Sequence, residues 1–145
     1  APPGVVLGRV VIRRHVLGRL GVRHAHHFAV DRDELATLYH ALDLYLVTSR
    51  EEGGPMALME SMSSHVPVVS TRVGMAPDLI TPGVSGALVE PDDVPAMVEE
   101  AMRILALPDG ASALKAAARE SVIRSADWSV VGRRHLDEVW KPLLG

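Results

Sequence analysis

The central residues 44–71 read LYLVTSREEGGPMALMESMSSHVPVVST. This stretch begins with an apolar run of strand type, Leu44–Val47, and ends with a second run rich in β-branched residues, Val66–Thr71. Between the two runs, Gly53-Gly54-Pro55 opens a helix, because a proline in the first helical turn lacks only an N–H group that the helix would leave unpaired. A strand, a helix and a second strand in this order form a βαβ unit, which predicts a parallel sheet.

Short strands and longer helices alternate in the same way on both sides of this stretch. Asp31, for example, begins a helix with Glu34 three residues later, which is the spacing of a capping box. The expected strands are residues 5–7, 24–30, 44–47, 66–71 and 86–89, and the expected helices begin near residues 11, 31, 55, 93, 111 and 128. The alternation predicts a Rossmann-like α/β fold, with a parallel sheet covered by helices on both faces and with ligands bound at the carboxyl ends of the strands.

Composition narrows the class of protein. The chain has 145 residues, of which 48% are hydrophobic and 23% are charged, as in one globular domain. The net charge of −3 argues against a nucleic-acid partner, which requires a basic surface. Without cysteine there is neither a disulfide framework nor a thiolate metal site. No run of about 18 apolar residues occurs, so we expect no transmembrane segment.

The segment from Ser49 to Glu60 carries the richest candidate chemistry. Glu52 and Glu60 lie on either side of a helix start, and Gly53 and Gly54 allow a ligand to approach the backbone closely. Unpaired N–H groups at a helix start bind phosphate, and carboxylates accept hydrogen bonds from ribose and sugar hydroxyls. From spacing alone, an ordinary turn with two solvated glutamates is an equally good interpretation.

The order of several motifs favours the first interpretation. From about Val22 to its end, the chain resembles the C-terminal, donor-binding domain of retaining GT-B glycosyltransferases of family four. Glu52 and Glu60 match the two positions of that family's motif of two glutamates separated by seven residues. Further stretches that are similar to the family, in the family's order, are 41–46 (ALDLYL), 66–71 (VPVVST), 73–80 (VGMAPDLI), 83–89 (GVSGALV) and Asp127-Trp128.

The resemblance implies the transfer of a sugar from a nucleoside-diphosphate sugar, with retention of configuration and with no cofactor or tightly held metal. By position, Glu60 would bind the ribose, Glu52 would contact the donor sugar, and the backbone of residues 54–57 would contact sugar and phosphate. The expected catalytic residue is Glu52, and the expected donor-binding residues are Arg50, Gly53, Gly54, Pro55, Met56, Ala57 and Glu60. For Arg50, a solvated surface position is an equally good alternative to a phosphate contact.

The resemblance also implies what this chain lacks. The family's first strand and helix carry an arginine and a lysine that hold the diphosphate, and neither has a counterpart before Val5. We therefore expect residues 1–145 to form a nucleotide-sugar-binding domain truncated at its N-terminus, without the acceptor domain and inactive alone. The alternative is a non-catalytic nucleotide- or sugar-binding module of the same fold. We expect the protein in the cytoplasm, or at the membrane surface in a full-length enzyme.

Weaker signals have ordinary structural interpretations. We interpret the histidines at 24, 26 and 27 as half-buried strand residues in preference to a metal site. We likewise interpret Asp31-Arg32-Asp33 as a helix cap in preference to a metal-binding motif. We expect Met56, Met59 and Met62 in the core. We also expect the helix Trp128–Leu143 to face the core, in preference to a partner or a membrane, because its apolar residues recur at helical spacing.

Overall fold

A computed structural model of the chain describes residues 31–54 and 56–144. Its sheet contains β1 (Tyr45–Val47), β2 (Val68–Thr71) and β3 (Ala87–Val89), which run parallel in the order β1-β2-β3. The prediction of a parallel α/β fold is therefore confirmed. Each strand is slightly shorter than predicted, and β2 begins after Pro67, which has no N–H group to donate to a neighbouring strand. The predicted elements before Asp31, including the three histidines, lie outside the described residues.

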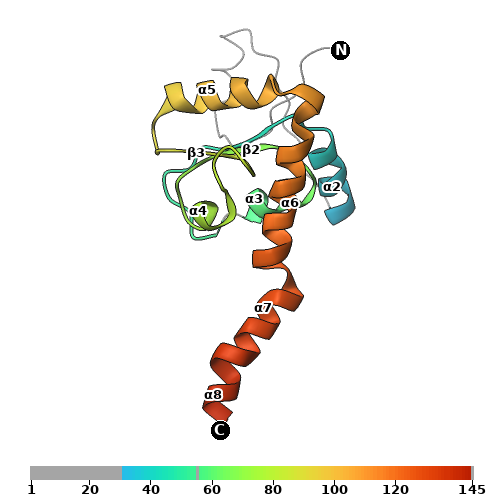
Figure 1. Cartoon of the computed structure of the whole chain (residues 1–145), viewed down its shortest axis with the longest axis vertical. Helices are drawn as coiled ribbons and strands as arrows, with labels where there is room; N and C mark the ends of the chain where they lie inside the picture. The colour runs from blue at the N-terminus through green and yellow to red at the C-terminus, as the bar shows by residue number, and fades with distance from the viewer. Residues whose placement is uncertain (1–30, 55, 145) are drawn as a thin grey trace.

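Helices cover both faces of the sheet. In chain order they are α2 (Arg32–His40), α3 (Met56–Ser63), α4 (Ala76–Leu79), α5 (Val94–Leu105), the 3₁₀ turn η1 (Pro108–Ala111), α6 (Ser112–Ala126), α7 (Trp128–His135), the π-helical turn η2 (Leu136–Trp140) and α8 (Lys141–Leu144). Figure 1 shows α5 over one face of the sheet, and α2, α3 and α4 on the opposite side. The short helix α4 was not predicted.

Alternating side chains of the strands fill two separate clusters. Tyr45, Val47 and Val68 pack in a cluster with residues of α2, α3, α4 and α6. Leu46 and Val69 pack in a second cluster with residues of α5, η1 and the start of α6. Because neighbouring residues of a strand point to opposite faces, both faces of this sheet are apolar and both are covered, as in other parallel sheets.

Local hydrogen bonds define several of the helix ends. Asp31 Oδ1 accepts a hydrogen bond from the Glu34 N–H at 2.8 Å, which confirms the predicted cap, and Asp93 caps α5 in the same way. At the end of α3, His65 adopts a left-handed conformation with φ of 58°. Its N–H donates to the Met62 carbonyl, and the next N–H donates to the Ser61 carbonyl. This is a Schellman motif, built here on a histidine in a position that usually takes glycine.

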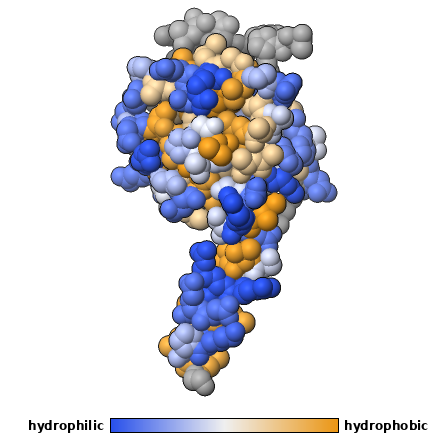
Figure 2. All heavy atoms as spheres, in the orientation of Figure 1, coloured by the Kyte–Doolittle hydropathy of each residue, from blue (hydrophilic) through white to orange (hydrophobic). Residues whose placement is uncertain are grey.

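The C-terminal helix does not face the core, so that prediction was wrong. Asp127 adopts an extended conformation after α6, and the chain then continues as α7, η2 and α8 away from the domain (Figure 1). No side chain of these three elements is buried, and Trp128 and Trp140 are 88% and 52% exposed. Figure 2 shows polar and apolar side chains side by side on the surface of this projecting part. Across the described residues, no helix is long and apolar enough to cross a membrane.

Candidate functional site

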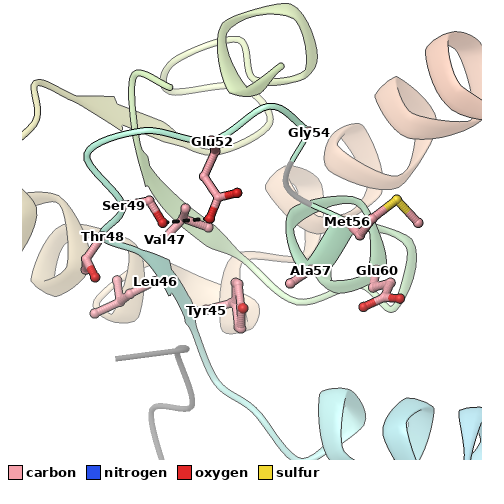
Figure 3. Close-up of a pocket in the computed structure, with 10 residues that line it drawn as sticks. All are labelled: Tyr45, Leu46, Val47, Thr48, Ser49, Glu52, Gly54, Met56, Ala57 and Glu60. Atoms are coloured by element: carbon pink, nitrogen blue, oxygen red, sulfur yellow. Dashed lines mark hydrogen bonds between the residues drawn. The ribbon is translucent and has the colours of Figure 1, made fainter. Parts of the chain in front are cut away.

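A pocket of about 320 Å³ opens where β1 ends and α3 begins. Its lining comes from β1, from the loop that follows and from the first turns of α3 (Figure 3). The lining residues are Tyr45, Leu46, Val47, Thr48, Ser49, Glu52, Gly54, Met56, Ala57 and Glu60. The position at the carboxyl end of a parallel strand is the one at which such sheets bind ligands.

Five of the residues singled out in the sequence meet in this pocket. The Glu52 side chain extends from the loop and the Glu60 side chain extends from α3, with Ala57 between them in Figure 3. Gly54 and Met56 also line the pocket. The main chain of α3 begins there, and the N–H groups of its first turn have no partner within the helix. Two carboxylates and a helix N-terminus therefore face one cavity.

Hydrogen bonds hold the loop that carries Glu52. The Ser49 hydroxyl donates to Glu52 Oε1 at 2.8 Å. The Thr71 hydroxyl, at the end of β2, donates to the Ser49 carbonyl at 2.6 Å. The loop after β1 is thus tied to the neighbouring strand, and one oxygen of the Glu52 carboxylate is tied to the loop.

A glycine supports the same loop from behind. Gly74 has φ of 49°, and a Cβ atom added there would lie 2.5 Å from the Glu52 carbonyl oxygen. No real Cβ atom tolerates that distance, so the position requires glycine for both its conformation and its space. The turn after β2 therefore packs directly against the Glu52 backbone.

Glu60 is held by a tyrosine of another helix. Tyr39 of α2 is 7% exposed, and its hydroxyl donates to Glu60 Oε2 at 3.1 Å, with the Ala57 carbonyl at 3.4 Å. Burial raises the pKa of the Tyr39 hydroxyl well above its ordinary value, and the neighbouring Tyr45 and the negative charge of Glu60 raise it further. The Tyr39 hydroxyl therefore stays protonated, and remains a donor, at neutral pH.

The remaining predicted residues lie at the edge of the pocket or outside its lining. The Arg50 guanidinium forms an ion pair with Asp92 at 2.7 Å, and both side chains are exposed. Gly53 is exposed and has no neighbouring atom within 4 Å of a Cβ position. Pro55 lies outside the described residues. Met56 is 62% exposed, so the prediction that it belongs to the core was wrong, whereas Met62 is fully buried as predicted.

Sequence reasoning missed the residues that support the two glutamates. Neither residue was singled out, although Gly74 lies within the stretch 73–80 that is similar to the family. A signal for Tyr39 did exist, because a tyrosine on a buried helix face needs a partner for its hydroxyl. The identity of that partner depends on how α2 packs against α3, which the sequence does not specify. Among the described residues, no group of three or more histidines and carboxylates could hold a metal.

Comparison with known proteins identifies the family of the chain. Residues 17–121, more than half of the chain, match the family described as glycosyl transferases group 1. The lipopolysaccharide core biosynthesis mannosyltransferase LpsB of Rhizobium meliloti is 34% identical over 101 residues, which cover 68% of this chain but only 28% of LpsB. The N-acetyl-alpha-D-glucosaminyl L-malate synthase of Bacillus anthracis is also 34% identical, over 66% of this chain and 25% of its own length.

Solved structures show the same fold. Sucrose-phosphate synthase of Thermosynechococcus elongatus has a TM-score of 0.77 and 26% identity, over 90% of this chain and 33% of its own. This chain thus spans less than a third of the first relatives' length and about a third of that enzyme. The parallel α/β fold, the match to the family and the identity to its members together show that the chain belongs to the glycosyl transferases of group 1.

Proposed function

We propose that the chain is the donor-binding domain of a retaining glycosyltransferase and that the pocket between β1 and α3 binds a nucleoside-diphosphate sugar. The observation that carries this proposal is the convergence of Glu52, Glu60 and the N-terminus of α3 on one pocket. A nucleoside-diphosphate sugar has hydroxyls at both ends, which need hydrogen-bond acceptors, and phosphates between them, which need hydrogen-bond donors. Along the chain, the pocket offers Glu52, the N–H groups at the start of α3 and Glu60, in that order.

The diphosphate would lie over the start of α3. The N–H groups of the first turn and the positive end of the helix dipole both favour an anion there. Gly54 lines the pocket just before the helix, and only the Met75 sulfur lies within 4 Å of its Cβ position. Because Gly54 has no side chain of its own, a phosphate can approach this backbone closely. The predicted phosphate contact of Arg50 would use N–H groups of the guanidinium other than Nε, which pairs with Asp92.

Glu60 would bind the ribose. Its carboxylate lies in the second turn of α3, beyond the helix start that would hold the phosphates. Each carboxylate oxygen has two lone pairs, so Glu60 can accept a hydrogen bond from Tyr39 and still accept both hydroxyls of a ribose diol. Hydrogen bonds to a charged group contribute about 1.5–3 kcal/mol each.

Glu52 would act on the transferred sugar. It lies on the loop side of the helix start, where the sugar falls if the ribose lies toward Glu60. A carboxylate fixed there by Ser49 can orient sugar hydroxyls and stabilise the positive charge that develops at the anomeric carbon. Glu52 would orient the sugar and stabilise charge, and it would not act as a covalent nucleophile.

The acceptor would be bound elsewhere. The chain spans 28% of the length of LpsB, and the polar groups that converge on the described pocket are those assigned above to the donor. We therefore expect residues 1–145 to bind donor but to transfer no sugar until an acceptor-binding domain is supplied. Transfer to sugar acceptors by this chain alone, measured by release of nucleoside diphosphate, would contradict that expectation.

Binding calorimetry on the chain tests the two glutamates, with UDP, GDP and inorganic pyrophosphate as probes. Glu60→Ala should weaken the better-bound nucleoside diphosphate about a hundredfold, because two charge-assisted hydrogen bonds are lost. Pyrophosphate should bind the variant as it binds the wild type. Glu52→Gln should leave the affinity for nucleoside diphosphate unchanged and reduce the additional affinity for the matching nucleotide sugar.

Glu99→Ala serves as the control, because it removes the same charge from an exposed position of α5. It should bind every probe like the wild type. If Glu60→Ala bound the nucleoside diphosphate normally, the donor would not lie along α3 as proposed. If Glu52→Gln lost affinity for the nucleoside diphosphate itself, the roles of the two glutamates would be reversed.

A further inference from the structure

Tyr39 is far from the motif in sequence but touches it in space. It lies 21 residues before Glu60, on a different helix, and its hydroxyl approaches Glu60 Oε2 at 3.1 Å. A carboxylate can only accept hydrogen bonds, so the phenol must be the donor in this contact. The Ala57 carbonyl at 3.4 Å is a second, longer acceptor for the same proton.

The ring of Tyr39 is fixed in place. It belongs to the buried cluster that contains Leu58 and Met62, the two buried apolar residues of α3. On another side its ring meets the ring of Tyr45 edge to face, with the centroids 5.8 Å apart and the planes at 63°. With the ring held in this way, the hydroxyl oxygen is fixed within hydrogen-bond distance of Glu60 Oε2.

Packing alone does not account for the hydroxyl. A phenylalanine would fill the same space in the cluster without burying a polar group, which costs free energy unless the group forms a hydrogen bond. Glu60, by contrast, is a flexible side chain with three rotatable bonds at the edge of an open pocket. A fixed donor would restrict the carboxylate to the orientations that face the pocket.

We propose that Tyr39 is a positioning residue for the donor site, which holds Glu60 Oε2 so that the carboxylate is already oriented for a ribose diol before the nucleotide arrives. The proposal rests on the function proposed above, in which Glu60 binds the ribose. Tyr39 itself lies behind the carboxylate and acts through Glu60. Preorganisation of this kind strengthens binding because less side-chain freedom is lost when the ligand binds.

The test is a double-mutant cycle on the chain, with Tyr39→Phe, Glu60→Ala and the double variant. The probes are inorganic pyrophosphate and whichever of UDP and GDP binds the wild type more tightly. Tyr39→Phe should weaken the nucleoside diphosphate about tenfold, the effect of one hydrogen bond to a charged group, and leave pyrophosphate unchanged. In the Glu60→Ala background, Tyr39→Phe should have no further effect.

Three results would overturn the proposal. Normal affinity of Tyr39→Phe, together with weakened binding by Glu60→Ala, would show that Glu60 binds ribose without help from Tyr39. An equal loss for pyrophosphate would show that the hydroxyl supports the fold in general. A loss that persists without Glu60 would show that Tyr39 acts through another group. Normal binding by Glu60→Ala would instead refute the proposed function itself.

A control variant separates the hydroxyl of Tyr39 from the loss of any hydroxyl on α2. Thr37 lies on the same helix, and its exposed hydroxyl donates to the Asp33 carbonyl, away from the pocket. Thr37→Val should therefore bind both probes like the wild type. Thermal melting of each variant checks that the fold is retained.

Discussion

At the scale of single residues, the geometry of the pocket depends on contacts that lie behind it. Gly74 shows this most directly, because its backbone packs against the Glu52 carbonyl and leaves no room for a Cβ atom. Gly83 provides a comparison within the same chain. Its φ of 76° is also positive, but no atom lies within 4 Å of its Cβ position.

We predict that Gly74→Ala destabilises the fold more than Gly83→Ala does. Gly83→Ala should cost about 1–2 kcal/mol, the cost of a left-handed conformation for an L-residue. Gly74→Ala should cost a further 1–3 kcal/mol or so, because the added atom also displaces the Glu52 loop. Urea denaturation of both variants measures the difference. Equal losses of unfolding free energy in the two variants would show that the Glu52 loop moves away from the added atom at no cost in free energy.

Sequence spacing, together with the resemblance to a family, singled out Glu52 and Glu60 but not the residues that hold them. The two glutamates lie in one short segment, so a strand, a loop and a helix start were enough to predict their neighbourhood. Tyr39 and Gly74 reach the same pocket through the packing of α2 and of the turn after β2. Those contacts join distant segments, and no local pattern encodes them.

At the scale of elements, apolar spacing predicted helices better than it predicted burial. The stretch after Asp127 is helical as expected, yet Leu136 and Leu143 are 48% and 74% exposed. A repeat of apolar residues identifies one face of a helix, but it does not identify the surface that covers that face. The extended conformation of Asp127 directs this helix away from the sheet, so no element of the described domain covers it.

We predict that the domain folds without its projecting helix. A chain that ends at Asp127 should lose less than about 0.5 kcal/mol of unfolding free energy, because no side chain of α7, η2 or α8 is buried. A chain that ends at Gly110 is the control and should not fold, because it lacks the buried Leu114, Ala118 and Val122 of α6. Circular dichroism with denaturant measures both. A loss of several kcal/mol in the first variant would show that the projecting helix packs against the domain.

At the scale of the whole molecule, residues 31–54 and 56–144 form a three-stranded parallel sheet between two apolar clusters, with the pocket at the carboxyl end of β1. The helix that forms one wall of the pocket, α3, also contributes the fully buried Leu58 and Met62 to a cluster. We therefore expect ligand binding at the pocket to stabilise the fold.

We predict that the preferred nucleoside diphosphate stabilises the folded chain. At a free concentration about a hundred times its dissociation constant, it should add about 2.7 kcal/mol to the unfolding free energy. At the same concentration, Glu60→Ala should gain only about 0.4 kcal/mol if its affinity is a hundredfold weaker. Urea denaturation with and without the ligand measures both values. Equal stabilisation of the wild type and Glu60→Ala would show that Glu60 does not contribute to binding of the nucleoside diphosphate.

The sequence by itself determined the class of fold, the succession of described strands and longer helices along the chain and the cap of α2, because these depend on apolar periodicity and on contacts between residues a few positions apart. It also determined where Glu52 and Glu60 lie relative to a helix start. Only the tertiary structure decided that Tyr39 meets Glu60, that Gly74 supports the Glu52 loop and that the last helix leaves the domain. These three features depend on how elements pack against one another, and packing is set by the combined shape of distant segments, which no single stretch of sequence contains.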